Sequence, residues 1–144
     1  MALIIRSYRA EDRPSVIALW RRVFPDAPCH NDPEMDIRHK MRVQPELFLV
    51  ALDDGTLVGT AMAGFDGHRG WVYYLAVLPE HRRRGIGRTL MQRIESGLTA
   101  RGCPKLNLQV RGTNRPAVAF YRCLGYEVED RISMGKKLDS KSDE

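Results

Sequence analysis

Apolar side chains recur at helical spacing in two long stretches of the chain. Residues 12–24 and 86–98 each place an apolar residue on one face at every turn, which predicts two amphipathic helices. The residues that form these faces are Val16, Leu19, Trp20, Val23, Ile86, Leu90, Ile94 and Leu98. Both helices are expected to pack their apolar face against a common core.

Prolines and glycines delimit two shorter helices. Residues 33–43 begin at a proline, which suits the first helical turn, and they end before Pro45. Residues 114–124 begin with Asn114, whose side chain is suited to capping free N–H groups. Gly125 then follows as a typical C-terminal stop.

Short apolar runs between these helices predict the strands of a sheet. The run 71–77 is apolar apart from two tyrosine hydroxyls, so we expect a central strand that is buried on both faces. The other predicted strands are 3–8, 47–52, 56–65, 105–110, 126–130 and 132–138. Asp53, Asp54 and Gly55 are typical of the turn in a hairpin between two of these strands.

The order of the elements predicts an α/β (α+β) fold, with a mixed sheet and helices on its faces. The chain has 144 residues and contains no internal repeat or linker, so we expect one domain. We place this domain at residues 1–138 and expect residues 139–144 to form a charged, disordered tail.

Composition narrows the class of protein. A hydrophobic content of 43% is ordinary for a globular protein, and the formal net charge of +5 favours an anionic partner. Nucleic acid, a phosphate-bearing cofactor and an acidic protein surface all fit that charge. Cys29, Cys103 and Cys123 form no C-x-x-C pair, which indicates reduced thiols and a cytoplasmic location. No apolar stretch approaches the length of a membrane span, so we expect no membrane partner.

The helix predicted from Ile86 has an unusual start. The positive end of a helix dipole favours Asp or Glu, and a capping side chain normally precedes it. Here the chain reads Arg82-Arg83-Arg84-Gly85-Ile86-Gly87-Arg88. A bound phosphate would cap the free N–H groups and neutralise the arginines, and the glycines would let it approach the backbone. Alternatively, the arginines are a solvated surface and the glycines a tight turn.

Two motifs together resemble a known family. A dinucleotide fingerprint would need a glycine where Leu90 stands, and the Gly-Lys-Ser/Thr of a P-loop is absent. Residues 82–87 have the form R-x-x-G-x-G, and residues 114–126 read N-x-x-A-x-x-F-Y-x-x-L-G-Y. With the element order, this pair resembles the GNAT superfamily of N-acetyltransferases over nearly the whole chain. Four further segments resemble the small bacterial YpeA-type acetyltransferases, namely residues 31–37, 47–51, 65–70 and 100–105.

The resemblance implies acetyl-CoA as cosubstrate, no metal, and a mostly antiparallel sheet that is splayed between its fourth and fifth strands. A bulge near Tyr74–Ala76 would open that splay, and the N–H of Val77 would polarise the thioester carbonyl. The implied cofactor-binding residues are Leu75, Ala76, Val77, Arg82, Arg83, Arg84, Gly85, Ile86, Gly87, Arg88, Thr89, Asn114 and Tyr121. Asn114 is equally explained as a plain helix cap.

The same resemblance places the general acid at Tyr121, which would protonate the leaving thiolate. A tyrosine with a reference pKa of about 10 suits a thiolate that is slightly less basic. The alternative for Tyr121 is an aromatic packing role on its helix.

The general base is less well defined. Relatives that acetylate ribosomal-protein N-termini often carry a glutamate where this chain has Gln109, and glutamine does not accept a proton. Glu80, His68 and Asp66 are substitutes, each with an ordinary surface or turn explanation, and a water-relayed proton is another.

The predicted function is transfer of an acetyl group to a primary amine by direct attack in a ternary complex. Acidic side chains in residues 24–41 would suit a cationic acceptor, although a solvated, helix-capping surface explains them without any acceptor. Two alternatives remain: a small basic RNA-binding module, and a non-catalytic acetyl-CoA sensor of the same fold. The arginines gather at one helix end and form no stripe, so nucleic acid is not expected. The sequence leaves room for a homodimer.

Overall fold

The computed structural model describes residues 2–26 and 32–138. Within it the chain forms two compact units, residues 1–108 and residues 109–144. The first unit holds the sheet and three helices, and the second holds the last helix. Cys29 and the expected tail at residues 139–144 lie outside the described residues.

The sheet of the first unit has five strands in the order β1-β2-β3-β4-β5. Their bounds are β1 Leu3–Ser7, β2 Phe48–Asp53, β3 Thr56–Phe65, β4 Gly70–Val77 and β5 Leu106–Asn107. The first four strands pair antiparallel, and β5 pairs parallel with β4. The predicted hairpin is confirmed, since Asp54 and Gly55 adopt the positive φ angles of 50° and 86° that its tight turn requires.

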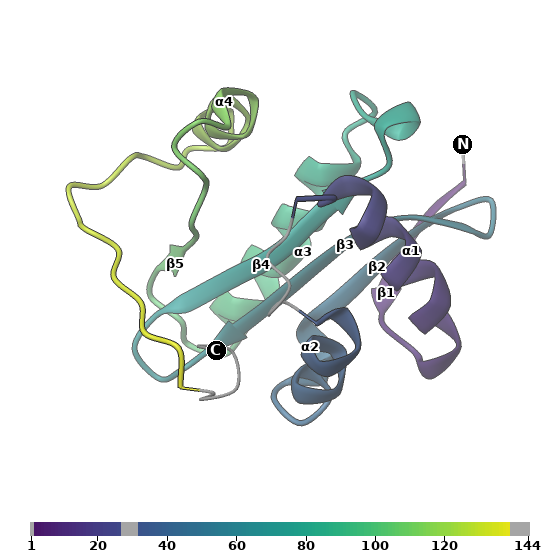
Figure 1. Ribbon diagram of the computed structural model, residues 1–144, viewed down its shortest axis with the longest axis horizontal. Coiled ribbons are helices and arrows are strands. Elements are labelled where there is room, and N and C mark those ends of the chain that lie inside the picture. The colour runs from purple at the N-terminus through teal and green to yellow at the C-terminus, as the bar shows by residue number, and fades with distance from the viewer. Residues whose placement is uncertain (1, 27–31, 139–144) are drawn as a thin grey trace. The chain divides into compact units, whose positions relative to one another are not determined.

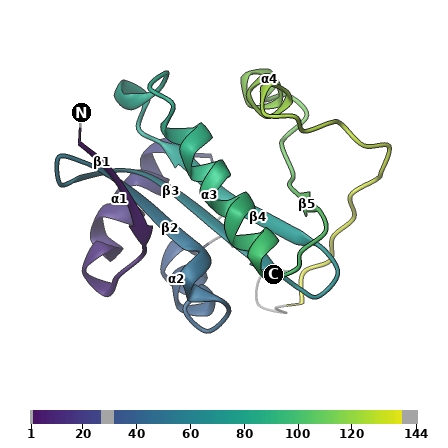
Figure 2. The same ribbon diagram turned by 180° about the vertical axis from the view of Figure 1, so that it is seen from behind.

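Helices cover both faces of this sheet, as predicted. Helices α1 (Arg13–Val23) and α2 (Pro33–Lys40) lie on one face, and α3 (Ile86–Ala100) lies on the other (Figures 1 and 2). On the first face Trp20 and Phe48 are the largest fully buried side chains of the core. On the second, Gly59 allows close packing, because a Cβ there would come within 3.3 Å of Leu90. Short 3₁₀ helices join these elements: η1 Ala10–Asp12, η2 Pro45–Leu47 and η3 Pro79–His81.

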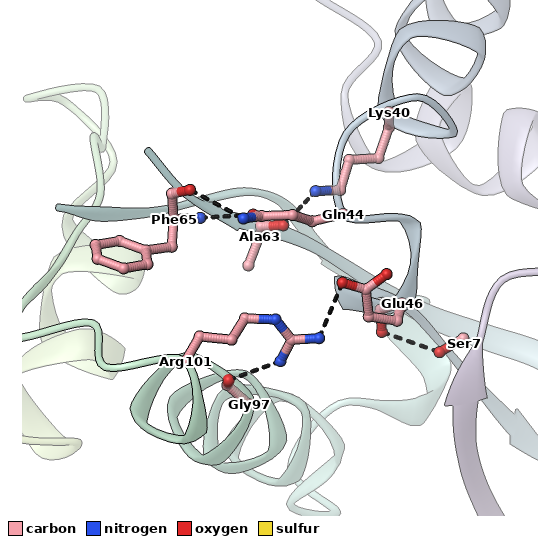
Figure 3. A network of polar contacts seen from close by, with 8 residues as sticks. All are labelled: Ser7, Lys40, Gln44, Glu46, Ala63, Phe65, Gly97 and Arg101. Carbon is pink, nitrogen blue, oxygen red and sulfur yellow. Dashed lines mark hydrogen bonds and ion pairs between the residues drawn. The ribbon is translucent and has the colours of Figure 1, made fainter. Parts of the chain in front are cut away.

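Side chains at the end of α2 and in the segment that follows it form hydrogen bonds with the backbone at the end of β3 (Figure 3). Lys40 is buried and its ammonium donates to the carbonyl of Ala63. The Gln44 side chain bonds both backbone groups of Phe65, at 2.8 and 3.0 Å. Burial lowers the pKa of Lys40 to about 8. These contacts take the place of ladder bonds where β3 ends.

The second unit contains α4 (Arg115–Cys123), which forms as the sequence predicts. The Asn114 side chain caps it by accepting from the N–H of Ala117 at 3.2 Å, and Gly125 follows it with a φ of 96°. Cys123, on this helix, is exposed.

The predicted closing strands, 126–130 and 132–138, are not strands in the structure. Alternating apolar residues favour an extended chain, but a strand also needs a neighbour for its ladder hydrogen bonds. Within the described part of the chain no strand pairs with this segment, and its apolar side chains are 69–92% exposed. These side chains are Val128, Ile132, Met134 and Leu138.

Two further strand predictions need correction. The predicted strand 105–110 shrinks to the two residues of β5. The expectation that β4 is buried on both faces is also wrong along part of its length, because Tyr73 is 52% exposed. The first correction follows from the pairing, because β5 meets only Gly70 and Trp71 at the beginning of β4. Among the described residues, no helix is long and apolar enough to cross a membrane.

Candidate functional site

The turn between η3 and α3 opens the first turn of α3 toward solvent. Arg83 and Gly85 adopt left-handed backbone conformations, with φ angles of 66° and 79°. Gly85 is the N-cap of α3, and none of the described side chains caps this helix or places a carboxylate in its first turn. Its free N–H groups and the positive end of its dipole are therefore available to an anion.

The arginines of this turn do not all point the same way. Arg82 donates through Nε to the carbonyl of Val77 at 3.2 Å, and Arg84 reaches Asp53 at 3.4 Å. Arg83 and Arg88 are exposed. Of the four predicted phosphate-binding arginines, Arg82 and Arg84 are thus partly engaged by the protein itself.

Asp53, at the end of β2, lies beneath the turn. Its Oδ2 is 3.4 Å from both His81 Nδ1 and an Arg84 nitrogen, and its side chain is 10% exposed. Its Oδ1 has no hydrogen-bond partner within the described residues. The sequence assigned Asp53 only to a hairpin turn, since nothing along the chain indicates that β2 ends next to His81.

Other predicted cofactor-binding residues of this turn lie in α3. Ile86 is buried in the core, so only its main chain is available to a ligand. Gly87 is the second residue of the helix. Thr89 is turned back onto the turn, because its hydroxyl donates to the carbonyl of Gly85 at 2.8 Å.

Strand β4 carries the predicted bulge. Its register with β3 pairs Met62 with Tyr73 and Thr60 with Ala76, so Tyr74 and Leu75 together stand opposite one residue, Ala61. Tyr74 has a φ of 54°, in the left-handed region. The prediction of a bulge near Tyr74–Ala76 is confirmed.

Beyond the bulge, the register directs the main chain of Val77 outward. Gly59 pairs with Val77, and the N–H of Leu78 donates to the carbonyl of Val58 at 2.9 Å. Hydrogen-bonded and non-bonded pairs alternate in an antiparallel ladder, so the N–H and C=O of Val77 face away from β3. The partner strand β5 stops opposite Trp71. The open edge of β4, Leu75 to Val77, therefore runs directly toward the arginine turn.

The three base candidates lie at opposite ends of β4, Glu80 at one end and His68 with Asp66 at the other. Glu80 lies in η3, at the Val77 end, where it is exposed and its carboxylate is 2.9 Å from Arg22. Hydrogen bonding to its own backbone N–H and to Arg22 lowers the pKa of Glu80. His68 lies in the turn before Gly70, where its N–H donates to Asp66 at 2.8 Å. The structure does not bring His68 to the arginine turn.

The remaining predicted site residues belong to the second unit. Tyr121 is half-buried on α4, between the rings of Phe120 and Tyr126 at centroid distances of 5.1 and 5.7 Å. Burial raises the pKa of Tyr121 to about 12. Asn114 caps the same helix. Gln109 donates through its amide to the hydroxyl of Ser133. Across residues 2–26 and 32–138, no three His, Cys, Asp or Glu side chains gather as a metal site would require.

Comparison with known proteins gives a consistent set of relatives. The sequence profile of the acetyltransferase (GNAT) family matches residues 13–126. A protein of Yersinia pestis (strain Pestoides F) named acetyltransferase is 49% identical over 134 residues, which cover 93% of this chain and 94% of the relative. Among solved structures, Ard1 from Thermoplasma volcanium superposes with a TM-score of 0.81 and 25% identity, over 90% of this chain and 85% of that one. The PaiA N-acetyltransferase of Thermoplasma acidophilum, solved in complex with coenzyme A, gives a TM-score of 0.75 and 26% identity over 92% and 94%.

Proposed function

Because the chain belongs to the GNAT family of acetyltransferases, we propose that it transfers an acetyl group from acetyl-CoA to a primary amine by direct attack in a ternary complex. One observation carries this proposal: a bulged strand with an open edge runs into a helix start that no described side chain caps. This arrangement supplies main-chain groups for an extended arm and N–H groups for a phosphate at adjacent positions.

The donor would be held by residues of the first unit. The pyrophosphate of acetyl-CoA suits the first N–H groups of α3, with Arg83 and Arg88 exposed beside them. The pantetheine arm suits the edge from Leu75 to Val77, where it would pair like an added strand. The N–H of Val77 is then the donor for the thioester oxygen as negative charge develops on it.

The chemical step forms one bond and breaks another. The nitrogen of a neutral amine attacks the thioester carbonyl carbon, the C–N bond forms, and the C–S bond breaks. The amine loses one proton and the thiolate gains one. We assign the second transfer to Tyr121, whose hydroxyl carries its proton at neutral pH, although its raised pKa makes it a weaker acid than a solvated tyrosine.

For the first transfer we favour a water-relayed proton. Glu80 lies at the right end of β4, but its lowered pKa makes it a weaker base, and Arg22 already engages it. His68 lies at the other end of the strand. A chain of waters needs neither side chain.

The packing of the aromatic side chains of β4 bears on the alternative function, RNA binding. An RNA-binding surface would use exposed aromatic side chains for base stacking. The candidates for stacking in β4 are Trp71, Tyr73 and Tyr74. Tyr73 is 52% exposed, whereas Tyr74 stacks on Trp20 at a centroid distance of 3.7 Å. That contact removes its ring from any such surface.

Substitution of Tyr121→Phe tests the catalytic half of the proposal. The ring stays and only the proton is lost, so the affinity for acetyl-CoA should change little. Turnover should fall about ten- to a thousand-fold, as expected for loss of a general acid. The measurement is thiol release with a panel of amines and peptide N-termini, together with the acetyl-CoA dissociation constant and the melting temperature.

Two results would count against this account. Unchanged turnover with chemistry as the slow step would remove Tyr121 from the mechanism and leave it a packing role. Acetyl-CoA binding without thiol release for any amine of the panel would favour the sensor over the enzyme.

A further inference from the structure

Thr60 is a fully buried polar residue whose hydroxyl makes two hydrogen bonds. It is 0% exposed in the middle of β3. Its Oγ1 accepts from the indole N–H of Trp20 at 2.9 Å and donates to the carbonyl of Tyr74 at 2.8 Å. A buried hydroxyl is costly unless it is paired, so these two bonds account for a threonine at this position of the core.

The carbonyl that Thr60 holds belongs to the bulge. Tyr74 has a φ of 54°, a conformation that residues with a Cβ rarely adopt, and a bulged residue loses its place in the ladder. Such a backbone persists only where its surroundings hold it. The Tyr74 ring stacks on Trp20, and its phenol donates to Asp36 Oδ2 at 2.6 Å. Tyr74 is therefore fixed at both its carbonyl and its side chain.

The bulge in turn decides which way the following main chain faces. Because two residues of β4 oppose Ala61, the N–H and C=O of Val77 face the open edge of the strand. Loosening of Tyr74 would let the register from Leu75 to Val77 relax. The hydrogen bond from Thr60 thus acts on the bulge, and through the bulge on the Leu75–Val77 edge that the pantetheine arm would use.

We infer that Thr60 is a positioning residue for the acetyl donor: its bond to the Tyr74 carbonyl holds the bulge that presents the Leu75–Val77 edge. This inference rests on the proposed function, because it assigns that edge to the donor. Thr60 should therefore affect binding of the pantetheine arm of acetyl-CoA. It should not affect binding of the nucleotide, which the first turn of α3 would hold.

Two ligands distinguish binding of the pantetheine arm from binding of the nucleotide. Acetyl-CoA carries both the nucleotide and the arm, whereas adenosine 3′,5′-bisphosphate carries only the nucleotide end. Each is titrated by calorimetry into the parent, Thr60→Val, Thr60→Ser and Val16→Ala, at a temperature where all are folded. Thr60→Val keeps the shape and removes the hydroxyl, and Thr60→Ser keeps the hydroxyl. Val16→Ala is the control for lost stability, since Val16 is buried in the same core and its apolar side chain makes no hydrogen bond to the bulge.

Thr60→Val should bind acetyl-CoA about tenfold more weakly, which corresponds in free energy to the loss of one hydrogen bond. It should bind the bisphosphate as tightly as the parent does. Thr60→Ser should restore the acetyl-CoA affinity. Val16→Ala should lower the melting temperature and change neither affinity. If Thr60→Val does not fold, Thr60→Cys replaces it, because its thiol donates only weakly and should show the same split.

Equal acetyl-CoA affinity for folded Thr60→Val and the parent would overturn the inference and leave the proposed function standing. An equal loss for both ligands would also overturn it, since Thr60 would then act only through general stability. A parent that binds neither ligand would instead contradict the proposed function and the inference with it.

Discussion

The two ends of β4 differ in how completely their backbone is paired. At Gly70 and Trp71 the strand lies between β3 and β5 in a regular register. From Tyr74 to Val77 it bulges, loses β5 as a neighbour and turns its outer edge outward. The first end has little left to offer a ligand, whereas the second offers main-chain groups that neither β3 nor β5 pairs with, next to a positive helix end.

The residues that brace each end differ in the same way. The paired end is supported by Lys40 and Gln44, which bond the backbone of β3 opposite it. The open end is supported by Thr60 beneath the bulge and Asp53 beneath the arginine turn. We therefore expect changes at the paired end to alter stability and changes at the open end to alter binding of the donor.

At the open end, Asp53→Asn should weaken acetyl-CoA binding about three- to tenfold. The amide keeps the size of the side chain but removes the negative charge that attracts Arg84 beside His81, so the turn loses its brace. Calorimetric titration measures the loss. Asp54→Asn, on the exposed neighbouring turn residue, is the matched control and should bind as the parent does. Equal affinities for the two variants would show that Asp53 does not support the turn.

At the paired end, Lys40 should make stability depend on pH. Its pKa is about 8 in the folded chain and 10.5 when unfolded, so the unfolded state holds more protons between these values. The free energy of unfolding should therefore rise as pH increases from 8 toward 10, by at most about 1.4 kcal/mol per pH unit. Urea unfolding of the parent and Lys40→Met at several pH values isolates this contribution. A rise of the same size in Lys40→Met would assign it to other groups.

The smallest effect is expected for His68→Ala. His68 precedes the paired end, and its backbone makes hydrogen bonds to Asp66 and Arg69 that alanine would keep, so turnover and acetyl-CoA affinity should stay within about twofold of the parent. Steady-state kinetics with an accepted amine provides the check. A large loss of turnover with a changed pH profile would make His68 the base. It would contradict the expectation that changes at the paired end alter stability alone.

Much of the fold could be predicted because the relevant signals are local. The apolar face of α3, the Asp54-Gly55 turn and the Asn114 cap each act within a few residues of sequence. The ends of the sheet could not be predicted in the same way. Residues 105–110 and 126–138 read as strands, but strand length depends on partners that lie elsewhere in the chain.

In the candidate site too, residues with local sequence signals could be predicted and residues that act through distant contacts could not. The arginine turn is visible in the sequence, because charges and glycines at a helix start are a local anomaly. Asp53 and Thr60 are not, since an aspartate in a turn and a threonine in a strand are ordinary. Their roles depend on which residues of distant elements the fold places beside them, namely His81 and Tyr74.

The most direct test of the account is acetyl-CoA titration of Gly87→Val beside the parent. Gly87 lies in the first turn of α3, where a branched side chain would stand in the path of the pyrophosphate. Gly135→Val is the control, because a Cβ at Gly135 would meet no atom within 4 Å. We expect the parent and the control to bind acetyl-CoA, more weakly as salt rises, and Gly87→Val to bind it at least about tenfold more weakly while remaining folded. Folded Gly87→Val that binds acetyl-CoA as tightly as the parent would contradict the assignment of this helix start to the phosphate.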